Sequence, residues 1–273
     1  PTRGIKAGGN TPSNIDTIDF FELSTTGNGV DFGNLAAAQR SQSSFGSQTR
    51  MVMAGGQDSS TREKIETIQF GSLGNAVDYG DSLSGTNENG RGTSNSILGL
   101  FAKGSVSNVI EQKTIASAGN ATDFGDLTVA RTAAHATSNG HGGLQAFSQR
   151  APELYSPTGT VVPNGFGQGD IGVYSGGEAP GSTNVIEFIQ ISTIGNSQDF
   201  GDLTSANAIG GAVSNSTRYV TIGDNTDTLD THYLEFKTKG NTAFFGDLTV
   251  RGWAGAGGSN STRGINYGRA NPA

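Results

Sequence analysis

Hydrophobic residues recur two positions apart in short runs along this chain, and no run shows the three-to-four-residue spacing of an amphipathic helix. The runs are bounded by Gly, Asn, Asp and Ser, which is typical of short strands joined by turns. One set of runs carries the apolar pairs Phe21 and Leu23, Ile68 and Phe70, Ile189 and Ile191, and Leu234 and Phe236, with Lys113 and Ile115 in a less regular copy. The pattern predicts an all-β protein.

The strand patterns belong to an internal repeat marked by one phrase: Asp, an aromatic residue, Gly, then Asp or Asn. Its copies lie at 31–35, 78–81, 123–127, 199–203 and, with Phe in place of the first Asp, 244–248. The phrase glycines are 47, 45, 76 and 45 residues apart, and a Gly-Asn pair precedes each copy. Each unit offers about four short strands in about 45–50 residues, the size of a β-propeller blade.

We therefore predict one β-propeller domain over 1–273, built from kelch-like four-stranded blades. A lone sheet of this size cannot cover both apolar faces, whereas blades packed around an axis bury both. A β-solenoid is the alternative. Five repeats are recognisable, at about 4–50, 51–97, 98–142, 171–218 and 219–263.

Closure of the ring is less regular. Residues 250–262 are expected to complete the sheet that begins at Gly4, which leaves 264–268 as an extra closing strand. Either an end strand is displaced, or the ring continues in sequence outside this chain.

The long step contains an insertion at 143–170, which holds three of the seven prolines and is therefore expected to be an ordered loop or hairpin. A degenerate sixth blade is the alternative. A long loop on a rigid scaffold is a common place for binding, and aromatic rings beside Arg suit sugar faces or a partner protein. The candidate ligand- or partner-binding residues are Phe147, Arg150, Tyr155 and Phe166. The competing interpretation is that the insertion only covers a gap between irregular blades.

The amino-acid composition excludes several classes of function. The chain has 43 glycines among 273 residues, 17 Lys and Arg against 24 Asp and Glu, a formal charge of −7, and no cysteine. An acidic chain without a basic block repels phosphate, so we expect no nucleic-acid partner. The missing thiols exclude disulfides, thiolate metal sites and cysteine nucleophiles. No run approaches the ~20 apolar residues of a membrane helix, so no membrane insertion is expected.

The sequence motifs give little evidence for catalysis or metal binding. Asp-Phe-Gly occurs at repeat spacing without the other kinase motifs, so we interpret it as a turn with a buried aromatic residue. One or two carboxylates per blade do not supply the 6–8 oxygens of a calcium site. His135, His141 and His232 lack a metal-binding spacing and are expected in turns or at the surface. We expect no catalytic residue, no metal and no cofactor, although a carboxylate pair from distant loops stays open.

The wording of several phrases resembles a known group of proteins. Residues 119–131 (GNATDFGDLTVAR), 138–144 (SNGHGGL), 214–218 and 259–263 (both SNSTR) look like kelch-like propeller repeat proteins of marine tailed phages, notably those infecting cyanobacteria. The resemblance implies a non-enzymatic virion protein, associated with a tail, fibre or baseplate and exposed on the particle. Its partners would be other virion proteins and a host surface polysaccharide. A glycan-degrading enzyme and a purely architectural decoration protein are the alternatives.

Overall fold

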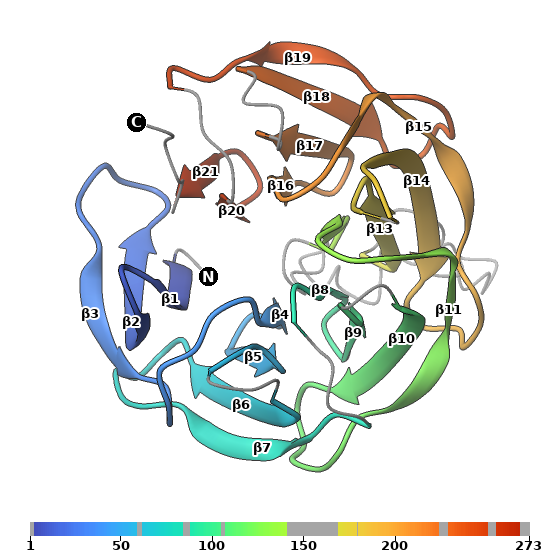
Figure 1. Cartoon of the computed structure of the whole chain (residues 1–273). Coiled ribbons are helices and arrows are strands. Elements are labelled where there is room, and N and C mark those ends of the chain that lie inside the picture. The colour runs from blue at the N-terminus through green and yellow to red at the C-terminus, as the bar shows by residue number, and fades with distance from the viewer. Residues whose placement is uncertain are drawn as a thin grey trace, which may run out of the picture.

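The computed structural model describes residues 3–58, 62–83, 88–104, 107–140, 169–178, 180–223, 229–250 and 255–267. Within these ranges the regular elements are all strands, and five antiparallel sheets of three or four strands, together with a two-stranded hairpin, surround a central axis (Figure 1). The predicted β-propeller with four-stranded blades is confirmed. No helix of membrane-spanning length and hydrophobicity occurs in the described part of the chain.

In the complete blades the strands run outward from the axis in chain order (Figure 1). Blade 1 holds β1 (Arg3–Asn10), β2 (Asn14–Glu22) and β3 (Val30–Asn34). Blade 2 holds β4 (Ser43–Gly46), β5 (Arg50–Ala54), β6 (Lys64–Gln69) and β7 (Val77–Asp81). Blade 3 holds β8 (Arg91–Ser94), β9 (Leu98–Ala102), β10 (Ser107–Thr114) and β11 (Thr122–Arg131).

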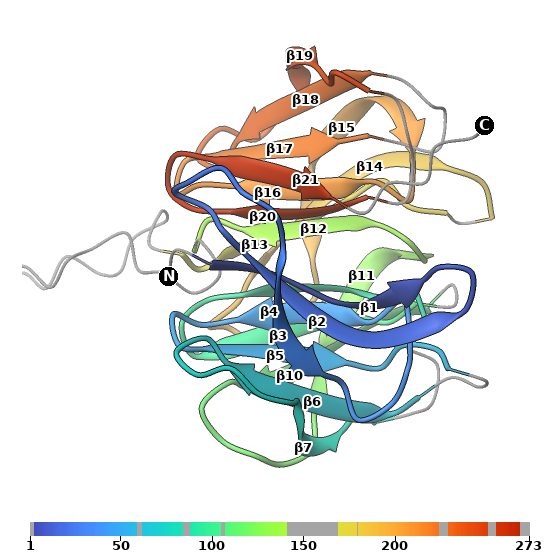
Figure 2. The same ribbon diagram turned by 90° about the vertical axis from the view of Figure 1, so that its left-hand side faces the viewer.

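The second half of the chain continues the ring. Blade 4 holds β12 (His135–Ser138), β13 (Ile171–Ser175), β14 (Thr183–Gln190) and β15 (Gln198–Asn207). Blade 5 holds β16 (Gly211–Ser214), β17 (Arg218–Ile222), β18 (Asp230–Glu235) and β19 (Ala243–Asp247). A separate hairpin of β20 (Ala256–Ser259) and β21 (Gly264–Tyr267) lies between blade 5 and blade 1 (Figures 1 and 2).

Ring closure differs from the sequence expectation. Residues 256–259 pair with β21 and not with β1, so they do not complete the sheet that begins at Gly4. Tyr267 in β21 donates to the carbonyl of Ile5 (2.8 Å), and its ring lies 5.5 Å from that of Phe21. The hairpin therefore packs against blade 1 without joining its sheet.

The repeated phrase forms the outermost strand of each blade, so its interpretation as a turn was wrong. The expected burial of its aromatic residue is confirmed in four blades: Phe32, Tyr79, Phe124 and Phe200 are 1–6% exposed. Alternation along a strand turns the preceding Asp to the opposite, solvent-facing side. The phrase thus encodes an amphipathic edge strand.

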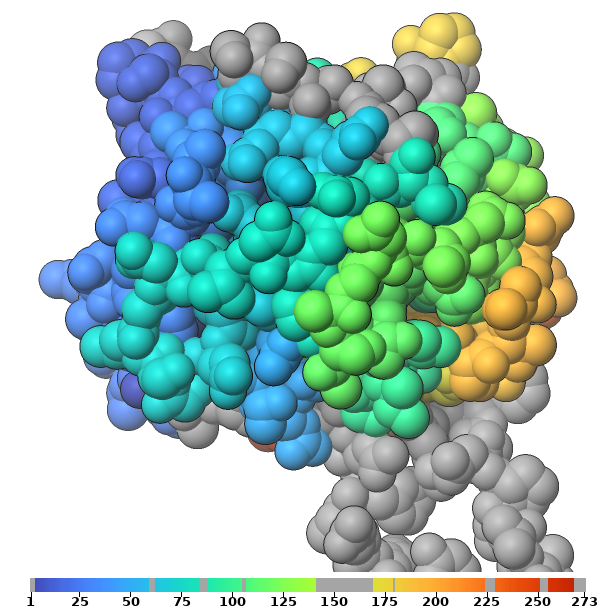
Figure 3. Space-filling model, turned by 90° about the horizontal axis from the view of Figure 1, so that it is seen from below, coloured from blue at the N-terminus to red at the C-terminus, as the bar shows by residue number. Residues whose placement is uncertain are grey.

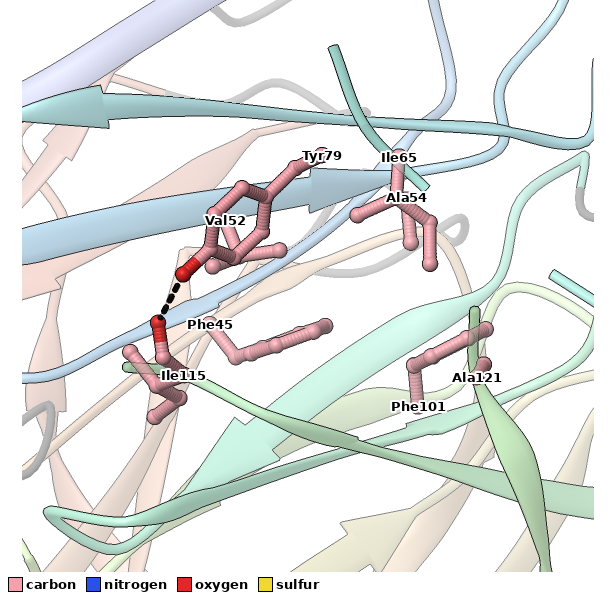
Figure 4. Packing of buried hydrophobic residues seen from close by; sticks show 8 residues of the cluster. All are labelled: Phe45, Val52, Ala54, Ile65, Tyr79, Phe101, Ile115 and Ala121. Atoms are coloured by element: carbon pink, nitrogen blue, oxygen red, sulfur yellow. Dashed lines mark hydrogen bonds between the residues drawn. The ribbon is translucent and has the colours of Figure 1, made fainter. Parts of the chain in front are cut away.

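Apolar cores lie between neighbouring blades. Figure 4 shows the core between blades 2 and 3, where the rings of Phe45 and Phe101 stack at 5.7 Å. The hydroxyl of Tyr79 crosses this interface and donates to the carbonyl of Ile115 (2.9 Å). Three equivalent clusters fill the interfaces of blades 1 and 2, 3 and 4, and 4 and 5. Packing between blades is what buries both faces of each sheet.

At the rim, blades lie side by side (Figure 3) and are joined by a recurring set of hydrogen bonds that we call the rim clasp. In blades 3 and 4, the Gly195 and Ser197 amides donate to the carbonyls of Phe124 (3.2 Å) and Asp126 (2.9 Å), and the Asn196 side chain accepts from the Asp126 amide (3.1 Å). The same three bonds join blades 1 and 2, 2 and 3, and 4 and 5. Each clasp links the phrase strand of one blade to the Gly-Asn pair of the next.

Candidate binding face

The four binding residues predicted from the sequence, Phe147, Arg150, Tyr155 and Phe166, lie outside the described residues. The structure does describe both points at which their insertion joins the propeller. The chain leaves β12 at Ser138 and returns at Ile171, the first residue of β13. The insertion therefore replaces the turn between the first and second strands of blade 4, and its predicted end at residue 170 agrees with this strand boundary.

In blades 3 and 5 and in the β20–β21 hairpin, the corresponding turns are short and are closed by one asparagine. The side chain of Asn215 accepts from the amides of Thr217 (2.9 Å) and Arg218 (2.7 Å), and Asn260 repeats this on Thr262 and Arg263. The Ser-Asn-Ser-Thr-Arg phrases are therefore hairpin turns. In blade 4, Asn139 makes the matching bond to the amide of Ile171 (2.9 Å), so the hairpin closes normally across the insertion.

Asp170 fixes the returning end of the insertion to two neighbouring blade elements. Its carboxylate accepts from the Asn95 side chain of blade 3 (3.1 Å) and from the Ser192 amide of blade 4 (2.9 Å), and it also bonds the Ser192 hydroxyl. Its carbonyl accepts from the amide of Ile191 (2.8 Å). Because Asn139 and Asp170 are both anchored, the propeller dictates where the insertion starts and ends.

These contacts place the two ends of the insertion on what we call the turn face, the side of the ring that carries the turns between first and second and between third and fourth strands. The two kinds of turn adjoin: the Phe70 amide bonds the Thr49 carbonyl, and the Ile115 amide bonds the Ile97 carbonyl (both 2.9 Å). Figure 2 shows these turns gathered at one side of the ring.

Exposed aliphatic side chains flank the base of the insertion. Ile97, two residues from Asn95, is 62% exposed, and Ile194, two residues from Ser192, is 70% exposed. Leu73 on the same face is 60% exposed. Large apolar residues exposed beside an anchored loop suit contact with a partner, whereas isolated exposed aliphatics elsewhere need no such explanation. Sequence reasoning missed Ile97 and Ile194, because only the fold brings their turns to Asp170.

The ring has a central channel with a volume of about 490 Å³, which the first strands line with small and hydroxyl-bearing residues. One serine from each of four strands donates to the carbonyl of the preceding blade: Ser94 to Gly46, Ser138 to Ser94, Ser214 to Ser138 and Ser259 to Ser214, at 2.6–2.8 Å. The recurring Ser-Asn pairs of the sequence were the signal for this ladder. Their hydroxyls hold blades together and are not free nucleophiles.

Buried carboxylates form a third repeated feature that the sequence reasoning missed. Glu66, Glu111 and Glu187 occupy matching positions in their third strands, and each follows an isoleucine in the sequence. Glu187 accepts from the Thr128 amide of blade 3 (2.9 Å) and from the Arg131 guanidinium (2.5 Å). Burial raises the pKa of Glu187 and lowers the pKa of Arg131, and their mutual attraction opposes both shifts.

The matching carboxylates have equivalent partners. Glu111 accepts from the Leu83 amide (3.0 Å) and forms an ion pair with Lys103 (2.9 Å). Glu66 accepts from the Ala36 amide and the Gln39 side chain, both at 3.0 Å. Buried carboxylates can mark a catalytic site, but here each of the three bonds a backbone amide of the preceding blade. The arrangement is that of a structural link between blades.

The two histidines that the structure describes lie in different blades. His135, expected in a turn or at the surface, is instead buried in β12, where its Nε2 accepts from the Gly210 amide (2.9 Å). His232 lies in β18 beside the ring of Phe244 at 6.2 Å, and His141 is outside the described residues. Among the residues that the structure describes, no group of three His, Asp or Glu side chains is placed to hold a metal ion.

Comparison with known proteins adds no relative. No family model matches the chain, and no curated protein is significantly similar to it. The geometry of the propeller and its turn face therefore carries the functional argument.

Proposed function

We propose that the chain is a non-enzymatic attachment module of a tailed-phage particle. In this proposal the propeller is a rigid holder, and the insertion of blade 4 contacts a host surface polysaccharide or a neighbouring virion protein. The phage assignment rests on the phrase resemblance at 119–131, 138–144, 214–218 and 259–263. The binding role rests on the structure of the turn face.

One observation carries the binding role: the insertion is anchored at both ends between two exposed isoleucines. Asn139 and Asp170 hold its ends, and Ile97 and Ile194 provide apolar surface at its base. Function usually resides in loops that a rigid scaffold positions, and copies of a weak site on one particle bind a surface with higher avidity. The repeated serine ladder, carboxylate links and rim clasps give the holder its rigidity.

The test measures binding of the labelled chain, in monomeric and multivalent form, to intact candidate host cells and to their extracted polysaccharide. Deletion of 150–166 or Tyr155→Ala should weaken binding at least about tenfold, which corresponds to about 1.4 kcal/mol. Ile97→Asp with Ile194→Asp should act in the same direction. Leu83→Asp is the matched control, because Leu83 is 53% exposed and follows β7 at the end opposite the turn face.

Circular dichroism and thermal unfolding should be unchanged in all these variants, since Asn139 and Asp170 remain in place. Full binding by the deletion variant would refute the role of the insertion. Shortening of the polysaccharide would favour a glycan-degrading enzyme, and binding only to particles that lack the protein would favour an architectural decoration.

A further inference from the structure

The described residues leave one position of the ring without all four strands. Complete blades have four strands, but within the described ranges blade 1 has only the second, third and fourth, β1 to β3. The β20–β21 hairpin supplies only a first and a second strand. Arg263, the residue before β21, donates to the Leu23 carbonyl of blade 1 (3.1 Å), as Arg3 of β1 donates to the Phe70 carbonyl of blade 2 (2.6 Å). The hairpin therefore occupies a sixth blade position, directly before blade 1.

Blade 5 presents a clasp surface without a partner among the described residues. Phe245 is 53% exposed, although its counterparts Phe32, Tyr79, Phe124 and Phe200 are 1–6% exposed. A Cβ on Gly125 would lie 2.4 Å from the carbonyl oxygen of Gly195 in the next blade, whereas a Cβ on Gly246 would meet nothing within 4 Å. The phrase strand β19 is thus shaped for a neighbouring Gly-Asn turn.

Blade 1 presents the complementary half of a clasp. Ala76, Ala121, Ser197 and Thr242, the residues after each clasping Gly-Asn pair, are all buried, but their counterpart Gly29 is exposed. No blade-to-blade hydrogen bond within the described ranges reaches Gly27 or Asn28. One half-clasp therefore faces the sixth position from each side.

Apolar and backbone surfaces complete this opening, which we call the notch. It comprises Phe245–Leu248, 27–29 and the outer edge of β21, which pairs only with β20. A groove of about 450 Å³ runs between blade 5 and the hairpin, with Val213, Val220 and Phe245 in its wall. On the channel side, the only strand that pairs with β1 among the described residues is β2, although the β1 carbonyls of Ile5 and Ala7 accept side-chain hydrogen bonds from Tyr267 (2.8 Å) and Gln42 (3.2 Å). Exposed strand edges beside an apolar groove favour strand addition.

We propose that the notch binds a three-strand segment of this same repeat, comprising the third and fourth strands of one blade and the first strand of the next. The open positions are the third and fourth strands of blade six and the first strand of blade 1, and these follow one another in the order of the repeat. One continuous segment therefore has the topology to fill all three.

The segment 183–214 of this chain shows the chemistry that the occupant needs. Gly195 and Asn196 would clasp Phe245–Asp247, as the same type of pair clasps Phe124–Asp126. The phrase at 199–203 would receive Gly27 and Asn28, as it receives Gly240 and Asn241 in blade 4. Ser214, which ends β16, would extend the serine ladder by donating to the carbonyl of Ser259.

The experiment uses a peptide of residues 183–214 as the probe and thiol labelling of the full chain as the readout. Because the chain has no cysteine, Phe245→Cys introduces a unique thiol in the notch. Saturating peptide should slow labelling of that thiol at least about tenfold, as expected for a surface covered by an added strand. The matched control is Phe244→Cys, since Phe244 is 58% exposed and its Asp counterparts face solvent in complete blades. Its labelling should not change.

Two peptide variants test the geometry. Asn196→Ala removes the acceptor for the Asp247 amide, and Gly201→Val puts a side chain where the Gly27–Asn28 turn must approach; a Cβ on Gly201 already meets the Gly240 oxygen at 2.3 Å in blade 4. Both peptide variants should slow labelling of the thiol at position 245 less than the unchanged peptide does.

Because the free peptide can aggregate, a second arm of the experiment extends the chain after Ala273 by 183–214 or by a shuffled sequence of equal composition.

The repeat extension should raise the thermal midpoint by at least about 5 °C and protect the thiol at 245, and the shuffled one should do neither. Absence of protection in both arms would overturn the proposal. Protection that rises with protein concentration without any added segment would also overturn it, because it would assign the notch to a second copy of the chain.

Discussion

Glu187 and Arg131 show how single residues hold this ring together. Both side chains are fully buried, and they join β14 of blade 4 to the end of β11 in blade 3. The Glu187 carboxylate also accepts a hydrogen bond from the Thr128 amide. The buried carboxylate, guanidinium and amide therefore all have partners, and burying any of them without a partner would cost free energy. At this scale the polar groups of the interior are connectors between blades.

Removing one partner of this pair should therefore be strongly destabilising. Arg131→Met leaves the Glu187 carboxylate buried without its cation and should lower the free energy of unfolding by about 3–5 kcal/mol. Urea unfolding followed by circular dichroism measures the change. The control is Arg218→Met at the half-exposed Arg218–Glu235 pair (2.7 Å), which should cost less than about 1 kcal/mol. Equal costs at the two sites would contradict a structural role for burial of the first pair.

Two buried tyrosines predict a loss of stability at alkaline pH. Burial raises the pKa of Tyr174 and of Tyr219, and neither side chain is exposed. Above the ordinary tyrosine pKa of about 10, the unfolded chain releases protons that the folded chain retains, so the free energy of unfolding falls as pH rises. Below that pH the contribution is complete. The free energy of unfolding, measured from about pH 8 to 12, should show this slope, and Tyr174→Phe should reduce it. If the slope is unchanged when Tyr174 and Tyr219 are both replaced by Phe, ionisation of these tyrosines is not its cause.

At the scale of strands, the rim clasp explains why one phrase recurs. Its Asp faces solvent, its aromatic residue fills the inter-blade core, and its Gly leaves room for the next blade's Gly-Asn turn. Glycines also allow close approach on the inner strands, since a Cβ on Gly92 of β8 would lie 2.4 Å from the Ser44 oxygen. The rim places the same demand on the outermost strands.

The clasp predicts different costs for the same substitution at two glycines that share the sequence Phe-Gly-Asp-Leu. Alanine is strained at both positions, because the φ angles are 153° at Gly125 and 157° at Gly246. Gly125→Ala also drives a Cβ against the Gly195 carbonyl, whereas Gly246 has open space beside it, so Gly125→Ala should cost about 1–3 kcal/mol more unfolding free energy than Gly246→Ala. Thermal and urea unfolding of the two variants give the comparison. Similar losses would show that the glycines matter for the strand itself and not for the neighbouring blade.

At the scale of the whole molecule, stability should follow the number of neighbouring blades. Blades 2, 3 and 4 have an apolar core on both sides, whereas blade 5 has one beside blade 4 and an exposed aromatic residue on its other side. Regions with fewer buried contacts open at lower free energy. Amide hydrogen exchange should therefore be slowest in β5, β9 and β13, and faster in β19 and in the β20–β21 hairpin. Uniform protection around the ring would contradict this gradient.

The sequence by itself determined the strand pattern, the blade period, the fold class and the place of the insertion. These follow from local rules, because alternation with period two sets which side chains face a core and Gly, Asn and Asp set where strands end. The same rules were wrong for the repeated phrase, because they interpret its glycine as a sign of a turn. The structure shows another reason for the glycine: at Gly125, the backbone of Gly195 in the next blade comes too close for a side chain.

Only the tertiary structure decided which strand edges meet and which surfaces stay open. Phe200 and Phe245 stand before the same Gly-Asp-Leu sequence, yet one is 4% and the other 53% exposed. Likewise, Ile97, Ile194 and Asp170 are far apart in the chain and gather at the base of the insertion through the ring. The physical reason is that a side chain's burial depends on its neighbour in space, and in a ring of repeats that neighbour belongs to another copy of the same sequence pattern.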